Sequence, residues 1–280
     1  MEEYSSRILQ AKQAIKQADY IIIGAGAGLS TAAGLLYSGG KFEKDFKEFI
    51  EKYHFDNLYS ASFYEFKTQE EKWAFFAKMI KLNRYNEKPL KLYQELYEIV
   101  KNKEYFVLST NVDGQFYNSG FDKDKVFEVQ GDYEYLQCKN ACHNKLYNNR
   151  DLVEKWLQNT KDCEIPSNLI MKCPVCGGNM DMNLRKDANF VQDENWYIQS
   201  EKYEDFLSRS KGKNVVLLEI GVGFNTPGII RFPFEQMTAN NVKTTLIRIN
   251  KDYPNPMLEI KNKIISFDED TNKIIEDLKE

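Results

Sequence analysis

The sequence has no excess of positive charge and no long apolar run, and its number of cysteines is odd. Its formal net charge is −4 over 280 residues, whereas proteins that bind nucleic acid by electrostatics carry a basic face. No apolar run reaches the roughly 18 residues of a membrane-spanning helix, and the acidic, polar start Met1–Tyr4 is not typical of a signal peptide. Five cysteines argue against a secreted disulfide scaffold. These absences predict a cytoplasmic protein that contacts neither membrane nor nucleic acid.

What is present is typical of an α/β protein with a sizeable core, since 42% of the residues are hydrophobic. Helical spacing of apolar residues predicts helices at 5–18, throughout 41–100 and at 270–280. Short apolar runs predict six buried strands, at residues 19–23, 105–109, 126–129, 214–220, 244–249 and 264–267. Strands that are mostly separated by helices predict a doubly wound parallel sheet, which binds its ligand at the carboxyl ends of the strands.

A glycine-rich stretch follows the first predicted strand. Gly24, Gly26 and Gly28 separate the apolar run from Ser30–Gly34, which is typical of the start of a helix. Glycines let a phosphate approach main-chain N–H groups at a helix N-terminus, so the stretch predicts a diphosphate cradle. The alternative is a tight strand-to-helix turn of any α/β protein. The usual dinucleotide fingerprint does not fit, because Leu29 occupies the place of its third glycine.

Polar or glycine-rich residues also follow the other predicted strands. They are Thr110–Asp113, Gln130–Asp132, Gly221–Asn225 and Asn250. Because the carboxyl ends of parallel strands share one edge of the sheet, we expect these residues to surround a ligand.

Two cysteine pairs predict a metal site. Cys138 and Cys142 are followed, after 30 residues, by Cys173 and Cys176 in a C-P-x-C-G-G turn. The two pairs together give four thiolates for a tetrahedral zinc ion, a closed set with a structural role. The alternative is two unrelated thiol pairs, and Cys163 or His143 could replace one ligand.

Several spaced motifs resemble those of the sirtuin family over nearly the whole chain. Gly26–Leu35 resembles G-A-G-x-S-x-x-x-G-I, Thr110–Asp113 resembles Q-N-I-D, and Gly221–Gly223 resembles G-T-S. Gln130 stands at the first position of the family's H-G, and Asn250 matches its adenosine-ribose asparagine. The cysteine pairs match its zinc module. The resemblance implies a Rossmann-like sirtuin fold, NAD as the co-substrate and a structural zinc ion.

The resemblance also implies roles for individual residues. The Gly26–Thr31 loop would hold the diphosphate, Val112 and Asp113 the nicotinamide amide, and Asn111 the ribose or a water molecule. The expected cofactor-binding residues are Gly26, Ala27, Gly28, Thr31, Leu35, Asn111, Val112, Asp113, Gln130, Gly221, Gly223, Phe224, Asn225 and Asn250. The expected catalytic residues are Asn111, Asp113, Gln130 and Arg185. Arg185 would orient the acceptor or the departing group, unless it is simply a solvated arginine.

Three departures from the deacylating sirtuins bear on the reaction. Leu36–Gly39 replaces P-D-F-R, Gln130 replaces histidine, and Leu184–Phe190 lacks the acyl-lysine lid motif. Deacylation needs a base with a pKa near neutrality, which a glutamine amide cannot supply. These departures resemble the macrodomain-linked class M sirtuins. That resemblance implies a protein ADP-ribosyltransferase whose substrate is a lipoylated, H-protein-like carrier, with functional links to a macrodomain hydrolase and a lipoate ligase.

The sequence leaves other activities open, and it also predicts domain boundaries. The alternatives are an NAD glycohydrolase, a protein-lysine deacylase, and a sensor of NAD or ADP-ribose without catalysis. We expect an NAD-binding domain at 1–36, 102–132 and 190–280. A helical module at 37–101 and a small zinc-binding domain at 133–189 would be inserted into it.

Overall fold

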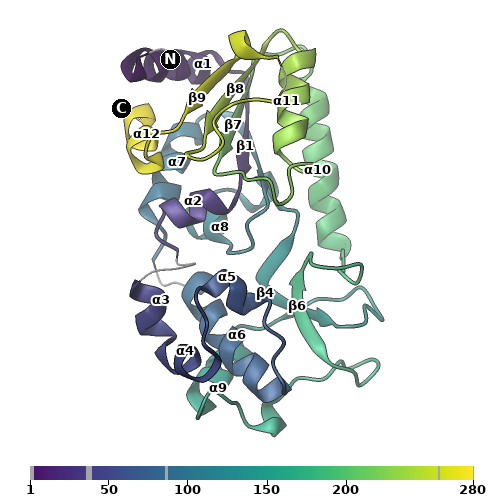
Figure 1. Cartoon of the computed structure of the whole chain (residues 1–280). Helices are drawn as coiled ribbons and strands as arrows, with labels where there is room; N and C mark the ends of the chain where they lie inside the picture. Colours follow the sequence, from purple (N-terminus) through teal and green to yellow (C-terminus); the bar gives the residue numbers. More distant parts are fainter. Residues whose placement is uncertain (1–2, 36–39, 86–87, 258, 280) are drawn as a thin grey trace. The chain divides into compact units, whose positions relative to one another are not determined.

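The computed structural model describes residues 3–35, 40–85, 88–257 and 259–279. The chain forms two compact units, which are coloured along the sequence in Figure 1. The first unit comprises Met1–Gly34, Pro89–Gln130 and Glu194–Glu280, and the second comprises Leu35–Lys88 and Gly131–Asp193.

A parallel sheet of six strands forms the centre of the first unit. Its order is β3-β2-β1-β7-β8-β9. The strands are β1 (Tyr20–Ala25), β2 (Glu104–Ser109), β3 (Val126–Glu128), β7 (Val215–Ile220), β8 (Thr244–Ile249) and β9 (Ile264–Phe267). Parallel pairing places Ile22 between Phe106 and Leu217. The prediction of a doubly wound parallel sheet is confirmed.

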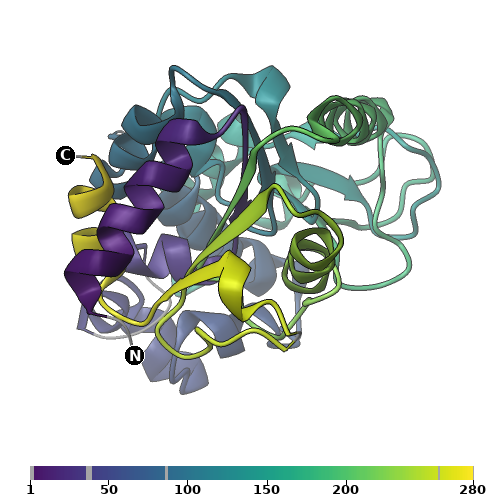
Figure 2. The same cartoon turned by 90° about the horizontal axis from the view of Figure 1, so that it is seen from above.

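Alternate residues of each strand pack under helices on opposite faces of this sheet. Ile21 and Ile23 share a core with α1 (Tyr4–Gln17), α7 (Lys91–Val100) and α12 (Thr271–Lys279). Ile22 belongs instead to the core beneath α10 (Glu194–Ser210) and α11 (Arg231–Asn240). Figure 2 shows α1 and α12 on one side of the sheet and α10 and α11 on the other. The remaining helices of the unit are α2 (Ala27–Ala32), α8 (Gln115–Asn118) and the short 3-10 helices η1 (Lys123–Lys125) and η3 (Lys261–Lys263).

The second unit combines several helices with a small antiparallel sheet. Its sheet has the order β5-β4-β6, with β4 (Gly131–Cys138), β5 (Tyr147–Asn148) and β6 (Met180–Leu184). These strands escaped prediction because β5 has only two residues, and β4 and β6 mix polar with apolar residues. The helices are α3 (Gly40–Asp45), α4 (Lys47–Tyr53), α5 (Leu58–Ser62), α6 (Gln69–Asn83), α9 (Arg150–Asn159) and the short η2 (Ser167–Leu169).

Aromatic side chains form the core of this unit. Phe46 is the N-cap residue of α4, and Phe49 lies within that helix. Both contact Phe75 of α6, with ring centroids 5.5 and 5.6 Å apart. Trp73 stacks on Trp156 at 4.9 Å and joins α6 to α9. All five of these aromatic side chains are at most 2% exposed. The segment 41–100, however, is broken into separate helices, and α4 ends at Tyr53, followed by the C-cap His54 in a left-handed conformation.

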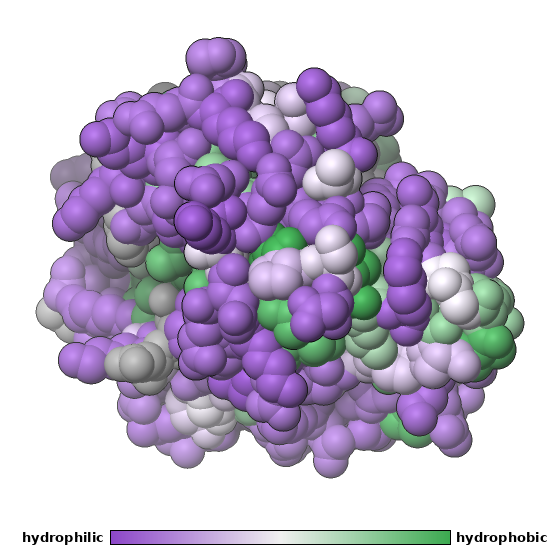
Figure 3. All heavy atoms as spheres, turned by 90° about the horizontal axis from the view of Figure 1, so that it is seen from below, coloured by the Kyte–Doolittle hydropathy of each residue, from purple (hydrophilic) through white to green (hydrophobic). Residues whose placement is uncertain are grey.

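The outer surface is largely polar where it can be seen. Figure 3 shows one face on which hydrophilic atoms predominate and hydrophobic atoms gather in separate patches. Within the described ranges, no helix combines the length and apolarity needed to cross a membrane.

Candidate functional site

The order of the parallel strands reverses between β1 and β7, which is where sheets of this kind bind ligands. The turns that follow these two strands touch. Gly28 donates its N–H to the Gly221 carbonyl oxygen at 3.0 Å. A Cβ atom on Gly26 would lie 2.6 Å from that same oxygen, and one on Gly221, whose φ is +63°, would lie 2.3 Å from the Leu29 nitrogen. Glycine at 26, 28 and 221 is thus required by the packing of the two turns themselves.

The residues after β1 offer few free side chains to the predicted diphosphate cradle. Ala27 and Gly28 are exposed at the start of α2. Thr31 is exposed as well, but its hydroxyl donates to the Ala27 carbonyl at 3.0 Å. Leu35 is buried and belongs to the second unit. The departure at Leu36–Gly39 lies outside the described residues.

The residues after β2 form a buried hydrogen-bond network with α2 and α7. Asn111 donates from Nδ2 to the Gly26 carbonyl at 3.1 Å and to the Ser30 hydroxyl at 3.0 Å. Ser30 donates to Asp113 Oδ2 at 2.5 Å, and its oxygen lies 2.8 Å from the Tyr93 hydroxyl. Asp113 Oδ1 accepts from the Gln115 N–H. These five side chains are at most 5% exposed.

The structure therefore brings Asn111 and Asp113 together, and adds Ser30, Tyr93 and Gln115. Ser30 lay inside the recognised glycine motif, so its position could have been anticipated. Tyr93 sits on an apolar helix face among 17 tyrosines in the chain, and no local pattern distinguishes it. Val112, between the two polar residues, is half-buried.

Gln130 follows β3 and contacts the long loop after β7. Its Nε2 donates to the Thr226 hydroxyl at 3.0 Å, and the Gln130 side chain is half-buried while Thr226 is exposed. Thr226 lies one residue beyond the predicted range Gly221–Asn225, so this partner was not predicted. The contact joins the end of β3 to a loop that starts three strands away in the sheet.

Asn250, after β8, holds the neighbouring loops. Its Nδ2 donates to the Val222 carbonyl at 2.8 Å, and its Oδ1 accepts from the Tyr253 N–H at 2.9 Å. Phe224 and Tyr253 are exposed and meet edge to face with centroids 5.0 Å apart. Gly223 faces open space, because a Cβ atom there would have no neighbour within 4 Å.

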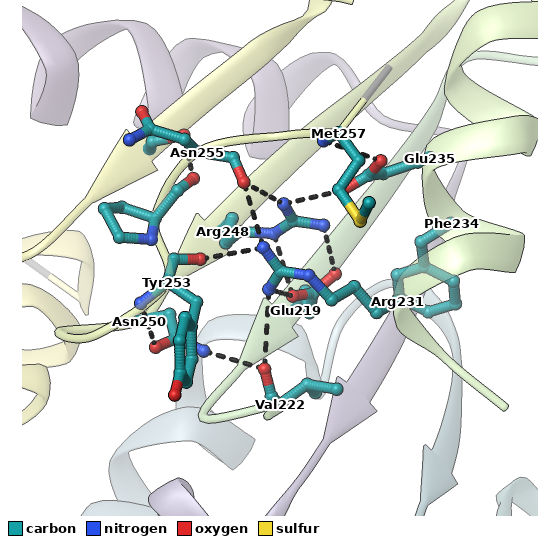
Figure 4. A network of polar contacts seen from close by, with 12 residues as sticks. Glu219, Val222, Arg231, Phe234, Glu235, Arg248, Asn250, Tyr253, Asn255 and Met257 are labelled. Atoms are coloured by element: carbon teal, nitrogen blue, oxygen red, sulfur yellow. Dashed lines mark hydrogen bonds and ion pairs between the residues drawn. The ribbon is translucent and has the colours of Figure 1, made fainter. Parts of the chain in front are cut away.

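A buried cluster of four charged side chains lies under these loops (Figure 4). Arg248 pairs with Glu219 and Glu235, each at 2.8 Å, and Arg231 lies 3.4 Å from Glu219. All four are at most 1% exposed. Arg231 also donates to the Tyr253 carbonyl at 3.0 Å and so ties the loop after β8 to α11.

Burial raises the pKa of Glu219, and the two arginines oppose that shift. Glu219 and Arg248 lie within two predicted apolar strands, so their ion pair was not predicted. A charged residue inside each apolar strand was the available signal. The two residues lie opposite each other on the paired strands β7 and β8.

The four predicted metal ligands form one cluster in the second unit. The Sγ atoms of Cys138, Cys142, Cys173 and Cys176 all lie within 4.8 Å of one another, so the predicted clustering is confirmed. Hydrogen bonds from the backbone N–H groups of Cys142 and Asn140 are the main causes that lower the pKa of Cys138 to about 6. Four thiolates at these distances fit a tetrahedral zinc ion.

The two alternative ligands lie differently. Cys163 is buried outside the cluster, in the turn Lys161–Glu164. His143 lies beside the cluster, with Nδ1 3.1 Å from Cys142 Sγ and Nε2 2.9 Å from the Tyr147 hydroxyl.

Arg185 follows β6 and is exposed. It belongs to the second unit, whereas Asn111, Asp113 and Gln130 belong to the first. Its neighbour Lys186 contacts Asp181 at 2.6 Å.

Comparisons with known proteins give two curated relatives, and no family model matches the chain. A protein ADP-ribosyltransferase of Staphylococcus aureus (strain Mu50) is 34% identical over 276 residues, which cover 98% of this chain and 88% of that protein. A probable bifunctional ADP-ribose hydrolase/ADP-ribosyltransferase of Fusarium oxysporum f. sp. cubense is 32% identical over 252 residues. The match covers 85% of this chain but only 41% of the fungal protein.

Solved structures of Sir2 enzymes share the fold. A Sir2 homologue in complex with NAD has a TM-score of 0.60 at 15% identity, covering 97% of this chain and 92% of that one. A structure described as the basis for the mechanism and regulation of Sir2 enzymes has a TM-score of 0.59 at 15% identity and covers 98% of both chains. At this identity the likeness concerns the fold alone.

Proposed function

The chain belongs to the protein ADP-ribosyltransferases with the sirtuin fold, and we propose that it transfers ADP-ribose from NAD to a lipoylated, H-protein-like carrier protein. The relative of S. aureus, which matches nearly the whole chain, supports the transfer reaction. The nature of the carrier rests on the resemblance to class M sirtuins, in which Gln130, Leu36–Gly39 and Leu184–Phe190 depart from the deacylating pattern.

Gln130 is the observation that carries this proposal. In deacylation a base must remove a proton from a ribose hydroxyl so that an acyl group can migrate. A glutamine amide has no proton that titrates near neutrality. Its Nε2 already donates to Thr226, and its side chain can still accept a hydrogen bond from a ribose hydroxyl. Transfer to an acceptor's own nucleophile needs only cleavage of the nicotinamide–ribose bond, so glutamine is compatible with it.

The strand-end residues of the first unit fit NAD, which would supply the ADP-ribosyl group and nicotinamide as the leaving group. We assign the turn Gly26–Thr31 to the diphosphate, and Val112 with Asp113 to the nicotinamide amide. The Asp113 carboxylate is held rigidly, because Ser30 and the Gln115 N–H both donate to it. Rigid polar groups of this kind stabilise developing charge without reorganising during the reaction.

The adenosine half would lie against the loops after β7 and β8. Asn250 fixes the Val222 carbonyl and the turn to Tyr253, so it would act by shaping these loops. Gly223 leaves open space beside them. Phe224 and Asn225 are exposed, and we assign them to NAD binding as well.

The cysteine cluster would hold a structural zinc ion. Four thiolates leave no open position for water, so the ion would stabilise the fold of the second unit and take no part in the reaction. Arg185, exposed just after β6, is proposed to orient the carrier or the departing group.

Another protein would remove ADP-ribose from the modified carrier. The fungal relative is described as both an ADP-ribose hydrolase and an ADP-ribosyltransferase, and this chain matches 41% of it. We propose that a macrodomain hydrolase and a lipoate ligase act together with this chain.

The test is an assay with labelled NAD, the full chain and a lipoylated H-like protein, beside the same carrier without lipoate and an acetyl-lysine peptide. We expect label on the lipoylated carrier and little peptide deacetylation. Robust deacetylation by the natural chain would overturn the proposal. Rapid consumption of NAD with no labelled protein would establish a glycohydrolase instead.

A further inference from the structure

The orientation of the Asn111 amide follows from its partners. Its Nδ2 lies 3.1 Å from the Gly26 carbonyl oxygen, which can only accept a hydrogen bond. The atom facing Gly26 must therefore be the nitrogen. Nδ2 is also within 3.0 Å of the Ser30 hydroxyl, so Oδ1 is the amide atom turned away from this network. Among the described residues, no protein donor is bonded to Oδ1.

The direction of the remaining hydrogen bonds follows from Asp113. The Ser30 hydroxyl has a single proton, and it donates this proton to Asp113 Oδ2 at 2.5 Å. The Ser30 oxygen then accepts from Asn111 and from the Tyr93 hydroxyl, which lies 2.8 Å away. The Tyr93 hydroxyl therefore donates the second hydrogen bond that the Ser30 oxygen accepts.

The Tyr93 hydroxyl is held in place by the core. Its side chain is fully buried in α7, and its ring meets Phe116 edge to face at 5.0 Å. The hydroxyl also lies 3.3 Å from Asn111 Nδ2. A buried oxygen between Ser30 and Asn111 restricts both groups to one arrangement.

We propose that Tyr93 is a positioning residue for the transfer reaction: through Ser30 it holds the Asn111 amide so that Oδ1 faces the reacting ribose carbon. This inference rests on the proposed function. When the bond between nicotinamide and the ribose carbon breaks, its electron pair leaves with nicotinamide and positive charge develops on the ribose. The negative end of a fixed amide dipole stabilises that charge. The acceptor's nucleophile then bonds to the carbon and releases its proton.

The test compares Tyr93→Phe with Tyr97→Phe, a matched control one helical turn further along α7. Tyr97 packs its ring on Phe121 at 5.1 Å and is half-buried. Nicotinamide release is measured in the presence of the lipoylated carrier and with water as the only acceptor, together with thermal unfolding. Tyr93→Phe should lower kcat roughly tenfold, the effect of about one buried hydrogen bond, while KM for NAD changes by less than about twofold. Tyr97→Phe should change neither.

Ser30→Ala supplies the second test, because it removes the same link from the other side. It should lower kcat at least as much as Tyr93→Phe, and the double variant should lose no more than Ser30→Ala alone. An unchanged kcat in Tyr93→Phe, a loss confined to KM or thermal stability, or additive losses in the double variant would each overturn the inference. Failure of the natural chain to label the carrier would refute the proposed function instead, and nicotinamide release would still report on Tyr93.

Discussion

Replacing Gly26 by alanine tests whether the glycine-rich turn is required by packing or only by a ligand. The new Cβ atom would lie 2.6 Å from the Gly221 carbonyl oxygen and 2.8 Å from Val222 Cα. Both are main-chain atoms and cannot rotate away. Hydrogen bonds also hold the turns together, from Gly26 N–H to Ile220 at 3.0 Å and from Gly28 N–H to Gly221 at 3.0 Å.

The magnitude follows from these contacts. Overpacking a dense site typically costs about 1–3 kcal/mol, and weakening one buried hydrogen bond adds about 1 kcal/mol. We therefore expect Gly26→Ala to lower the free energy of unfolding by about 2–4 kcal/mol in the absence of NAD. Gly223→Ala is the control, because nothing lies within 4 Å of its added Cβ. Its effect on stability should stay within about 0.5 kcal/mol.

The assay is urea unfolding of the full chain followed by circular dichroism, first without NAD and then with it. If the Gly26→Ala variant unfolded at the same urea concentration as the natural chain, the packing argument would be refuted. If it were as stable as the natural chain but failed to bind NAD in calorimetry, the turn would serve the ligand alone.

Three further changes test separate features. Cys173→Ser should lose bound zinc in metal analysis while Cys163→Ser retains it; full zinc in the first variant would contradict the four-cysteine site. Arg231→Met leaves Glu219 buried with one charge partner fewer, so urea unfolding should show a loss of about 3–5 kcal/mol, and an unchanged midpoint would contradict the network's role. Gln130→His alone should not confer deacetylation of an acetyl-lysine peptide, because the segment 184–190 also departs from the deacylase pattern.

The parallel sheet could be predicted because its strands carry their signal locally. Apolar runs such as Val215–Ile220 are buried on both faces, and they stand out against the helical periodicity around them. The antiparallel strands of the second unit lack this signal. In β4, buried Asp132 and Gln137 take the place of apolar residues, and only their hydrogen bonds to other segments explain them.

The candidate site was predictable where it depends on strand ends or on spacing. Asn111 and Asp113 follow one strand, so topology alone places them at the ligand edge. The four clustered cysteines follow from two short-range pairs. Tyr93, Thr226 and the pairing of Glu219 with Arg248 depend on contacts between distant segments, and no local pattern specifies such contacts.

The groups proposed for the two halves of sirtuin-type chemistry are held in this chain in different ways. The groups proposed to act in bond cleavage, Asn111 and Asp113, are at most 5% exposed and share hydrogen bonds with Ser30. A change at any of them would leave another buried polar group unpaired, which costs about 1–3 kcal/mol. Gln130 is half-buried, and its Nε2 donates to the exposed Thr226. The residue at this position can therefore change with little cost to the core, and under the proposed function such a change would replace acyl migration by direct transfer while cleavage is kept.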